Sequence, residues 1–200
     1  MAIRKENIYL IHKAAEAIGK KYSDGLLMLE LGNQYVKDDP NFKTAKEYFT
    51  SLGVRHTSID INGKDGALRV DLSIISDEHQ NYFDIVTNYG TSEHVTQQYQ
   101  VFANIHNWTK VGGAMVHGSP QAGYWFHHGK FNYELEFFTR MAKENNYKVV
   151  VCESIQKIDK PLPRDLYYCG IVLIKQIDAP FISESIFDKM EGLRRHSKEF

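Results

Sequence analysis

Short apolar runs alternate with segments of helical periodicity along most of the chain, and this alternation is the feature that most constrains the fold. Seven runs have the composition of strands: 26–31, 56–61, 67–72, 82–88, 111–117, 147–152 and 168–174. Apolar residues at helical spacing lie around them, near 8–18, 45–52, 95–105 and 133–142. Alternation of this kind predicts an α/β fold, with a mainly parallel sheet covered by helices on both faces.

The connection between the last two predicted strands differs from the others. Its segment 161–165 is rich in turn residues and has no helical pattern, so we expect these strands to pair antiparallel as a C-terminal hairpin. One domain then covers 1–177, including an N-terminal helix. A tail over 178–200 carries one more helical pattern at Ile186, Met190 and Leu193, which we interpret as a solvated terminal helix, with a helix that docks on a partner as the alternative.

Composition excludes several classes of protein. The 200 residues carry 24 Lys and Arg against 25 Asp and Glu, a net charge of −1, whereas dedicated binders of duplex nucleic acid are usually strongly basic. The sequence contains no apolar run long enough to span a membrane and no apolar signal-peptide segment at its start. Its two cysteines, Cys152 and Cys169, lie in apolar runs and are expected as buried thiols. We therefore expect a cytoplasmic protein; the sequence does not indicate its oligomeric state.

Polar side chains stand at the ends of consecutive predicted strands. Glu30 ends the first, Asp60 the second and Asp71 the third, and Asn88 ends the fourth. In open parallel sheets, ligands bind beyond the carboxyl ends of the strands, at the topological switch point. Acids grouped at one such edge repel each other unless they meet a cation or hydrogen-bond donors. They therefore predict a ligand that is rich in donors and positively charged.

The residues of the loop after the first strand distinguish between two kinds of nucleotide cofactor. A dinucleotide pyrophosphate needs a glycine-rich turn that opens directly into a helix. Here Gly32 is the only glycine of the loop, and Asp38, Asp39 and Pro40 delay the next helix. S-adenosyl-L-methionine carries an ammonium, a sulfonium, two ribose hydroxyls and an adenine amine, and so suits the acids better.

At this point the sequence resembles the class I S-adenosylmethionine-dependent methyltransferases of the small-molecule type, over roughly 26–175. The resemblance rests on these segments, in the family's order: Leu29-Glu30-Leu31-Gly32, Ile59-Asp60, Val70-Asp71-Leu72, Phe83-Asp84-Ile85-Val86, Ser92-Glu93-His94-Val95 and Trp108-Thr109-Lys110-Val111-Gly112-Gly113. It implies a Rossmann-like seven-stranded sheet. Two features depart from the family pattern: Asn33 and Tyr35 stand where further glycines are usual, and the linker 62–66 is too short for a full helix.

The resemblance also implies the residues that bind the cofactor. Glu30, Gly32 and Asn33 would lie at the methionine end, and Asp60 would accept from the ribose hydroxyls. The remaining members of the set would contact the adenine or floor the pocket near the sulfonium: Ile61, Asp71, Leu72, Asn88, Tyr89 and Gly90.

The acceptor of the methyl group would bind beyond the later strands. His94, His117 and His128 are candidate general bases, since an acceptor must lose a proton near neutral pH. Tyr124, Trp125 and His127 are candidate acceptor contacts. We expect the acceptor to be a small molecule or a glycan.

A metal site formed by Glu93, His117, His127 and His128 is the sharper alternative for these histidines. Adjacent histidines point in different directions on most backbones, however, and the sequence contains no metal-binding histidine spacing, so we expect no metal ion.

For the protein as a whole, two functions remain as alternatives to methyl transfer: a nicotinamide-dependent oxidoreductase, and a non-catalytic binding domain of the same fold.

Overall fold

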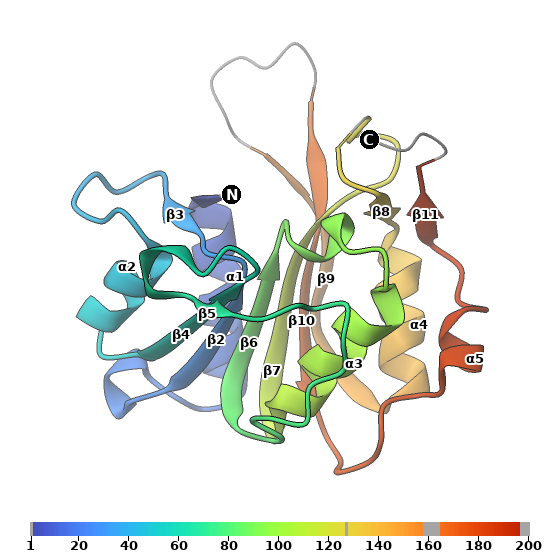
Figure 1. The fold of residues 1–200 in the computed structure, drawn as a ribbon, viewed down its shortest axis with the longest axis horizontal. Helices are drawn as coiled ribbons and strands as arrows, with labels where there is room; N and C mark the ends of the chain where they lie inside the picture. Colours follow the sequence, from blue (N-terminus) through green and yellow to red (C-terminus); the bar gives the residue numbers. More distant parts are fainter. Residues whose placement is uncertain (1, 127, 158–164, 197–200) are drawn as a thin grey trace.

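The computed structural model describes residues 2–126, 128–157 and 165–196. Its centre is a seven-stranded sheet in the order β5-β4-β2-β6-β7-β10-β9 (Figure 1). The strands are β2 (Leu27–Leu31), β4 (Arg55–Asp60), β5 (Leu68–Arg69), β6 (Phe83–Tyr89), β7 (Thr109–Pro120), β9 (Tyr147–Gln156) and β10 (Tyr167–Lys175). The first five are parallel, and β10 runs antiparallel to both β7 and β9. The predicted α/β fold and the C-terminal hairpin are confirmed.

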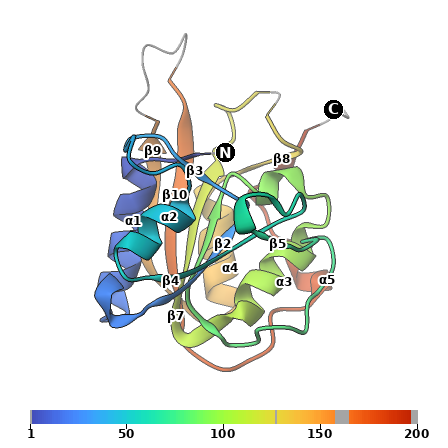
Figure 2. The ribbon, with the colours of Figure 1, turned by 60° about the vertical axis from the view of Figure 1, so that its left-hand side comes forward.

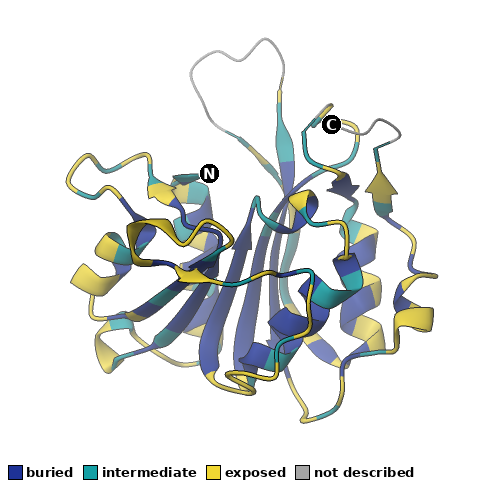
Figure 3. Cartoon of the chain, in the orientation of Figure 1, coloured by how far each residue is buried: buried dark blue, intermediate teal, exposed yellow. Residues whose placement is uncertain are grey.

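Helices cover both faces of this sheet and divide the core into two apolar layers. On one face lie α1 (Lys5–Ala17) and α2 (Ala45–Ser51); on the other lie α3 (Gln98–Trp108) and α4 (Leu135–Glu144) (Figure 2). The central strands are buried between the layers (Figure 3). Side chains alternate between the two faces along each strand, so that Met28 joins the α1 layer and Leu29 the α3 layer.

Short elements close the ends of the sheet. They comprise β1 (Ala2–Ile3) paired with β3 (Tyr35–Val36), β8 (Phe131–Tyr133) paired with β11 (Leu193–Arg195), α5 (Glu184–Phe187), and the 3-10 turns η1 (Tyr22–Asp24), η2 (Lys64–Gly66) and η3 (Ser92–His94). The linker after β4 holds only the 3-10 turn η2 in place of a crossover helix, as its length predicted.

Three expectations about local structure need correction. The third strand is only two residues long, because the chain after Arg69 leaves the sheet. Tyr133 belongs to β8, and the helix that follows begins at Leu135. The C-terminal segment is not a solvated helix: Phe187 and Met190 are buried in the α3–α4 layer.

Both cysteines are free thiols, as expected; Cys169 is fully buried, whereas Cys152 is only half-buried. Among the described residues, the helices are all too short or too polar to cross a membrane.

Candidate functional site

Strand order reverses between β2 and β6, because β4 and β5 continue outward from β2 while β7 continues from β6. Two cavities open at the carboxyl edge of these strands. The acidic cavity, about 400 Å³, is lined by Asp60 and Asp71. The aromatic cavity, about 180 Å³, is lined by Tyr89, Trp125 and Tyr168. Gly90 belongs to the walls of both, so the cavities adjoin at the end of β6.

Seven of the ten residues predicted to bind the cofactor line the acidic cavity. They are Gly32, Asn33, Asp60, Ile61, Asp71, Leu72 and Gly90. These residues stand at the ends of four different strands, β2, β4, β5 and β6, and the fold brings them to a single cavity at the switch point, where α/β sheets bind their ligands.

Asp60 stands at the end of β4 and is half-buried. Its Oδ2 accepts from the backbone N–H of Asn33 (3.0 Å), and its Oδ1 accepts from the N–H of Asn62 (2.9 Å). Each carboxylate oxygen has about two acceptor sites, so both oxygens retain acceptor capacity toward the cavity. The two backbone bonds fix the orientation of the carboxylate.

Asp71 lies beyond β5 and lines the same cavity. Hydrogen bonds from the hydroxyl and N–H of Ser73 lower the pKa of this exposed carboxyl, and the Ser73 N–H lies 2.9 Å from Oδ1. Asp71 is therefore ionised at neutral pH and adds a second negative charge to the same cavity.

The loop between β2 and β3 is built around one glycine. Gly32 has φ of +78°, and an added Cβ would collide with the Thr91 side chain and lie 2.9 Å from Gln34 Nε2. Thr91 Oγ1 donates to the Leu31 carbonyl (2.9 Å), and Gln34 Nε2 donates to the Tyr89 carbonyl (3.0 Å). Side-chain hydrogen bonds thus join this loop to the turn after β6.

Glu30, predicted to lie at the methionine end, does not reach the acidic cavity. It shares a strand face with Met28, so its side chain points into the layer beneath α1 and α2. Only 1% of Glu30 is exposed, and its Oε2 lies 4.0 Å from His56 Nε2. Burial raises the pKa of Glu30 well above its ordinary value, which favours the neutral acid.

Asn88 and Tyr89 also depart from their predicted places. Asn88 is fully buried, and its amide is engaged with Ser92 and with His117 Nδ1 (3.2 Å). Tyr89 points to the opposite face of β6, donates to the carbonyl of Asn7 (2.9 Å) and lines the aromatic cavity.

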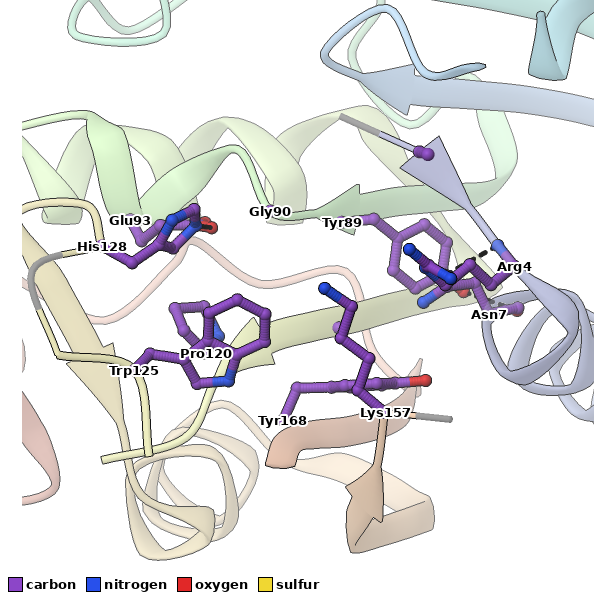
Figure 4. A pocket seen from close by; sticks show the side chains of 12 residues that line it. Arg4, Asn7, Tyr89, Gly90, Glu93, Pro120, Trp125, His128, Lys157 and Tyr168 are labelled. Carbon is purple, nitrogen blue, oxygen red and sulfur yellow. Dashed lines mark hydrogen bonds and ion pairs between the residues drawn. The ribbon is translucent and has the colours of Figure 1, made fainter. Parts of the chain in front are cut away.

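The aromatic cavity lies between the ends of β6, β7 and β10 and the start of α1 (Figure 4). The Trp125 indole donates through Nε1 to the carbonyl of Tyr167, which fixes the ring. Lys157 Nζ stands 5.0 Å from the centre of that ring, a cation–π distance. Arg4 borders the cavity on the α1 side (Figure 4), so the lining combines aromatic surface with two cationic side chains.

The residues predicted to contact the acceptor separate in the structure. Trp125 lines the aromatic cavity, whereas Tyr124 packs on Tyr167 with ring centroids 4.7 Å apart and does not line it. His127 lies outside the described residues.

The three predicted catalytic histidines also separate. His117 is fully buried between Phe102 and Phe138 and reaches neither cavity. Burial lowers the pKa of His117 to about 3, so the structure does not support it as a general base. His94 borders the acidic cavity and His128 the aromatic cavity.

Glu93 joins these two histidines. Its Oε1 lies 3.5 Å from His128 Nε2 and 3.9 Å from His94 Nε2, and only 1% of its side chain is exposed. Burial lowers the pKa of His94 despite the attraction of Glu93. The turn η3 supplies Glu93 and His94, and the loop before β8 supplies His128.

Some cavity residues were not identified from the sequence. Lys157 and Tyr168 stand at the end of β9 and the start of β10, and an antiparallel strand begins at the edge where its parallel neighbours end. The strand-end argument could therefore have found both. Arg4 and Asn7 come before the first strand of the central sheet in the sequence. The strand-end argument therefore does not identify them.

No family model matches the sequence, and no curated protein matches it. Many solved structures resemble the fold. A 1,6-didemethyltoxoflavin-N1-methyltransferase from Burkholderia thailandensis, solved with 1,6-didemethyltoxoflavin and S-adenosylhomocysteine bound, aligns with a TM-score of 0.60 at 13% identity, covering 86% of this chain and 79% of that one. An S-adenosylmethionine-dependent methyltransferase from Methanosarcina mazei aligns with a TM-score of 0.60 at 10% identity, covering 89% and 100%.

A third similar structure, a putative methyltransferase from Bacillus halodurans, has a TM-score of 0.52 at 12% identity and covers 84% of this chain and 95% of its own. The chain therefore has the Rossmann-like fold of the class I S-adenosylmethionine-dependent methyltransferases, as the resemblance in sequence predicted. At such low identity the likeness establishes the fold.

Proposed function

We propose that this protein is an S-adenosyl-L-methionine-dependent methyltransferase that binds its cofactor in the acidic cavity. The observation that carries the proposal is that Asp60 and Asp71 line one cavity at the switch point of a methyltransferase-like sheet. Two carboxylates in one cavity favour a cationic ligand rich in donors. The loop after β2 argues against a dinucleotide, because it leads into β3 and not into a helix that could hold a pyrophosphate.

In this proposal the carboxylate of Asp60 accepts hydrogen bonds from the two ribose hydroxyls, and Asp71 accepts from the polar edge of the adenine. Ile61 and Leu72 supply apolar contacts to the ring. The methionine end lies over Gly32 and Asn33, and the sulfonium lies toward Gly90. Glu30 acts beneath the loop, since its Oε2 accepts from the N–H of Gln34 (3.3 Å).

We place the methyl acceptor in the aromatic cavity, because Gly90 forms part of both walls. Methyl transfer is an in-line displacement, so holding the acceptor atom against the methyl carbon supplies much of the rate. The acceptor atom forms a bond to the methyl carbon while the carbon–sulfur bond breaks. The electron pair of that bond stays on sulfur, S-adenosylhomocysteine leaves as a neutral thioether, and the acceptor's proton passes to solvent.

The dimensions and lining of the aromatic cavity favour a small-molecule acceptor over a glycan chain. A cavity of about 150 Å³ holds one benzene ring, and this cavity measures about 180 Å³. Trp125 and Tyr168 offer ring faces, and Arg4 and Lys157 offer positive charge. A planar acceptor that carries a negative charge or acceptor oxygens fits this lining.

Ligand binding tests the cofactor directly. S-adenosylhomocysteine at 100 times its Kd adds about 2.7 kcal/mol to stability, which raises the Tm by about 5–10 °C for a chain of this size. We expect that rise with S-adenosylhomocysteine and none with NAD+. A rise with NAD+ alone would favour the oxidoreductase and refute the proposal.

Turnover requires a second assay, in which the protein is incubated with methyl-labelled cofactor and pools of small molecules and of glycans. Label in a small-molecule product supports the proposal, and label in a glycan corrects the acceptor class. Binding of S-adenosylhomocysteine without transfer to either pool would favour a non-catalytic domain of this fold.

A further inference from the structure

Glu93, His94 and His128 meet at the junction of the two cavities. Glu93 and His128 line the aromatic cavity, and His94 lines the acidic cavity. One ligand atom from each residue, a carboxylate oxygen and two imidazole nitrogens, lies within 4.8 Å of the other two. In Figure 4 the carboxylate of Glu93 lies directly beside the His128 ring.

We propose that these three side chains bind a divalent transition-metal ion. Metal–ligand distances of about 2.1 Å place neighbouring ligand atoms about 3.0–3.4 Å apart in tetrahedral or octahedral geometry. Glu93 Oε1 stands 3.5 Å from His128 Nε2 and 3.9 Å from His94 Nε2. Both distances exceed those of good hydrogen bonds, and the three atoms reach the spacing of a metal centre if both rings move closer to the carboxylate oxygen and to each other.

The second oxygen of Glu93 supplies an independent argument. Glu93 Oε2 is buried and has no hydrogen-bond partner among the described residues, although an unsatisfied buried carboxylate oxygen is costly. A bound cation would offset this cost.

The loop that carries His128 is held close to Glu93. Gly129 has φ of +68°, and a Cβ at this position would lie 2.8 Å from Glu93 Cγ. The N–H of Lys130 donates to the Glu93 carbonyl at 2.7 Å. The glycine thus permits the close approach that brings His128 to the carboxylate.

The donor set defines the class of metal. Two imidazoles and one carboxylate suit Zn²⁺, Mn²⁺, Fe²⁺ and Co²⁺, whereas Mg²⁺ and Ca²⁺ prefer sites made of oxygen ligands. His94 and His128 are 47% and 37% exposed, which leaves a path of entry and open coordination positions. If the proposed methyl transfer holds, those positions face the acceptor, and the ion would bind an acceptor oxygen beside the methyl group.

This proposal replaces the sequence-based expectation that no metal binds. That expectation relied on the spacing of histidines along the chain, and it weighed His117 and His127 with Glu93 and His128. The fold instead pairs Glu93 with its sequence neighbour His94, and it buries His117 elsewhere.

Cobalt titration of the full-length, tag-free protein tests the site without reference to activity. We expect visible d–d absorption that saturates at one equivalent of Co²⁺, competition by Zn²⁺, and no competition by equimolar Mg²⁺. Glu93→Gln, His94→Ala and His128→Ala should each raise the Kd for Co²⁺ at least tenfold. His12→Ala and His79→Ala are matched controls at exposed histidines, and these should bind as the parent protein does.

The proposal is overturned if the parent protein gives no saturable absorption, or if the three variants bind Co²⁺ as tightly as the controls. Circular dichroism of each variant verifies folding. Glu93→Gln keeps the size of the side chain, so a loss of Co²⁺ binding in this variant reports the lost carboxylate rather than a collapse of the buried site. Affinity for S-adenosylhomocysteine separates this proposal from the function above. His128 does not line the acidic cavity, so His128→Ala should lose Co²⁺ and keep S-adenosylhomocysteine.

Discussion

Replacing Asp60 with asparagine removes one negative charge and one acceptor oxygen from the acidic cavity while it keeps the size of the side chain. In the parent protein, each carboxylate oxygen accepts one backbone N–H, from Asn33 or Asn62, and retains capacity for one ribose hydroxyl. In Asp60→Asn, one ribose hydroxyl faces the amide NH₂ group and the other donates to the uncharged amide oxygen.

The expected loss follows from the strength of these bonds. Hydrogen bonds to charged groups contribute about 1.5–3 kcal/mol, and the half-buried position of Asp60 exposes its carboxylate partly to water. We therefore expect the two weakened bonds together to cost about 1.5–3 kcal/mol, which raises the Kd for S-adenosylhomocysteine about 10–150-fold. Isothermal titration calorimetry measures this change.

Asp65→Asn is the matched control, because it removes a charge from the neighbouring loop. Asp65 binds Lys43 (2.7 Å) and the Asn33 amide (3.1 Å) and does not line the cavity. Asparagine also tolerates its positive φ of 51°. We expect the Asp65→Asn affinity to stay within twofold of the parent protein. If Asp60→Asn also stays within twofold, the ribose does not bind at Asp60 and our reasoning about the acidic cavity fails.

Three further predictions concern the loop, the acceptor and the acid stability. Gly32→Ala should lower the unfolding free energy by at least about 1 kcal/mol in urea titrations, because the left-handed backbone disfavours alanine and the new methyl meets Thr91; an unchanged midpoint would contradict this. Trp125→Ala should raise the KM for the acceptor about tenfold or more and leave cofactor affinity within twofold, and a reversed pattern would place the acceptor elsewhere. Burial raises the pKa of Asp84, but hydrogen bonds from Leu27, Lys110 and Lys20 outweigh it and hold the pKa below the ordinary value. The stability that this carboxylate contributes is therefore complete above about pH 4 and is lost as the pH falls through its lowered folded-state pKa. Urea unfolding between pH 3 and 7 should show a shallower acid loss for Asp84→Asn, whereas parallel curves would exclude the contribution.

The sequence determined the order of the helices and strands, and it indicated that a ligand would bind at the carboxyl edge of the sheet. Apolar runs and helical spacing are local properties, so they indicate each strand and helix without knowledge of the fold. The acids at strand ends followed from the same pattern, because parallel strands end at one edge. For this reason Asp60 and Asp71, which follow two different strands, could be predicted to share a cavity, and the structure places them there.

The tertiary structure decided which face of a strand each predicted residue occupies. Glu30 and Asn88 also stand at strand ends, yet alternation turns Glu30 into the α1–α2 layer, and Ser92 and His117 engage the Asn88 amide. The His117 side chain likewise reaches neither cavity and packs against Phe102 and Phe138. A shift of one residue along a strand reverses the direction of its side chain, and the sequence pattern does not fix boundaries to one residue.

Contacts between segments that are distant in the sequence also could not be predicted from local sequence patterns. The segment after Asp178 resembles an isolated surface helix, but β11 pairs with β8, and Phe187 and Met190 enter the core. The approach of His128 to Glu93 depends on the backbone of Gly129 and on the way the loop before β8 folds over η3. Local periodicity thus determined the sheet and its acidic edge, whereas the direction of side chains and the meeting of remote loops were decided by packing, because both depend on contacts that no local stretch of sequence contains.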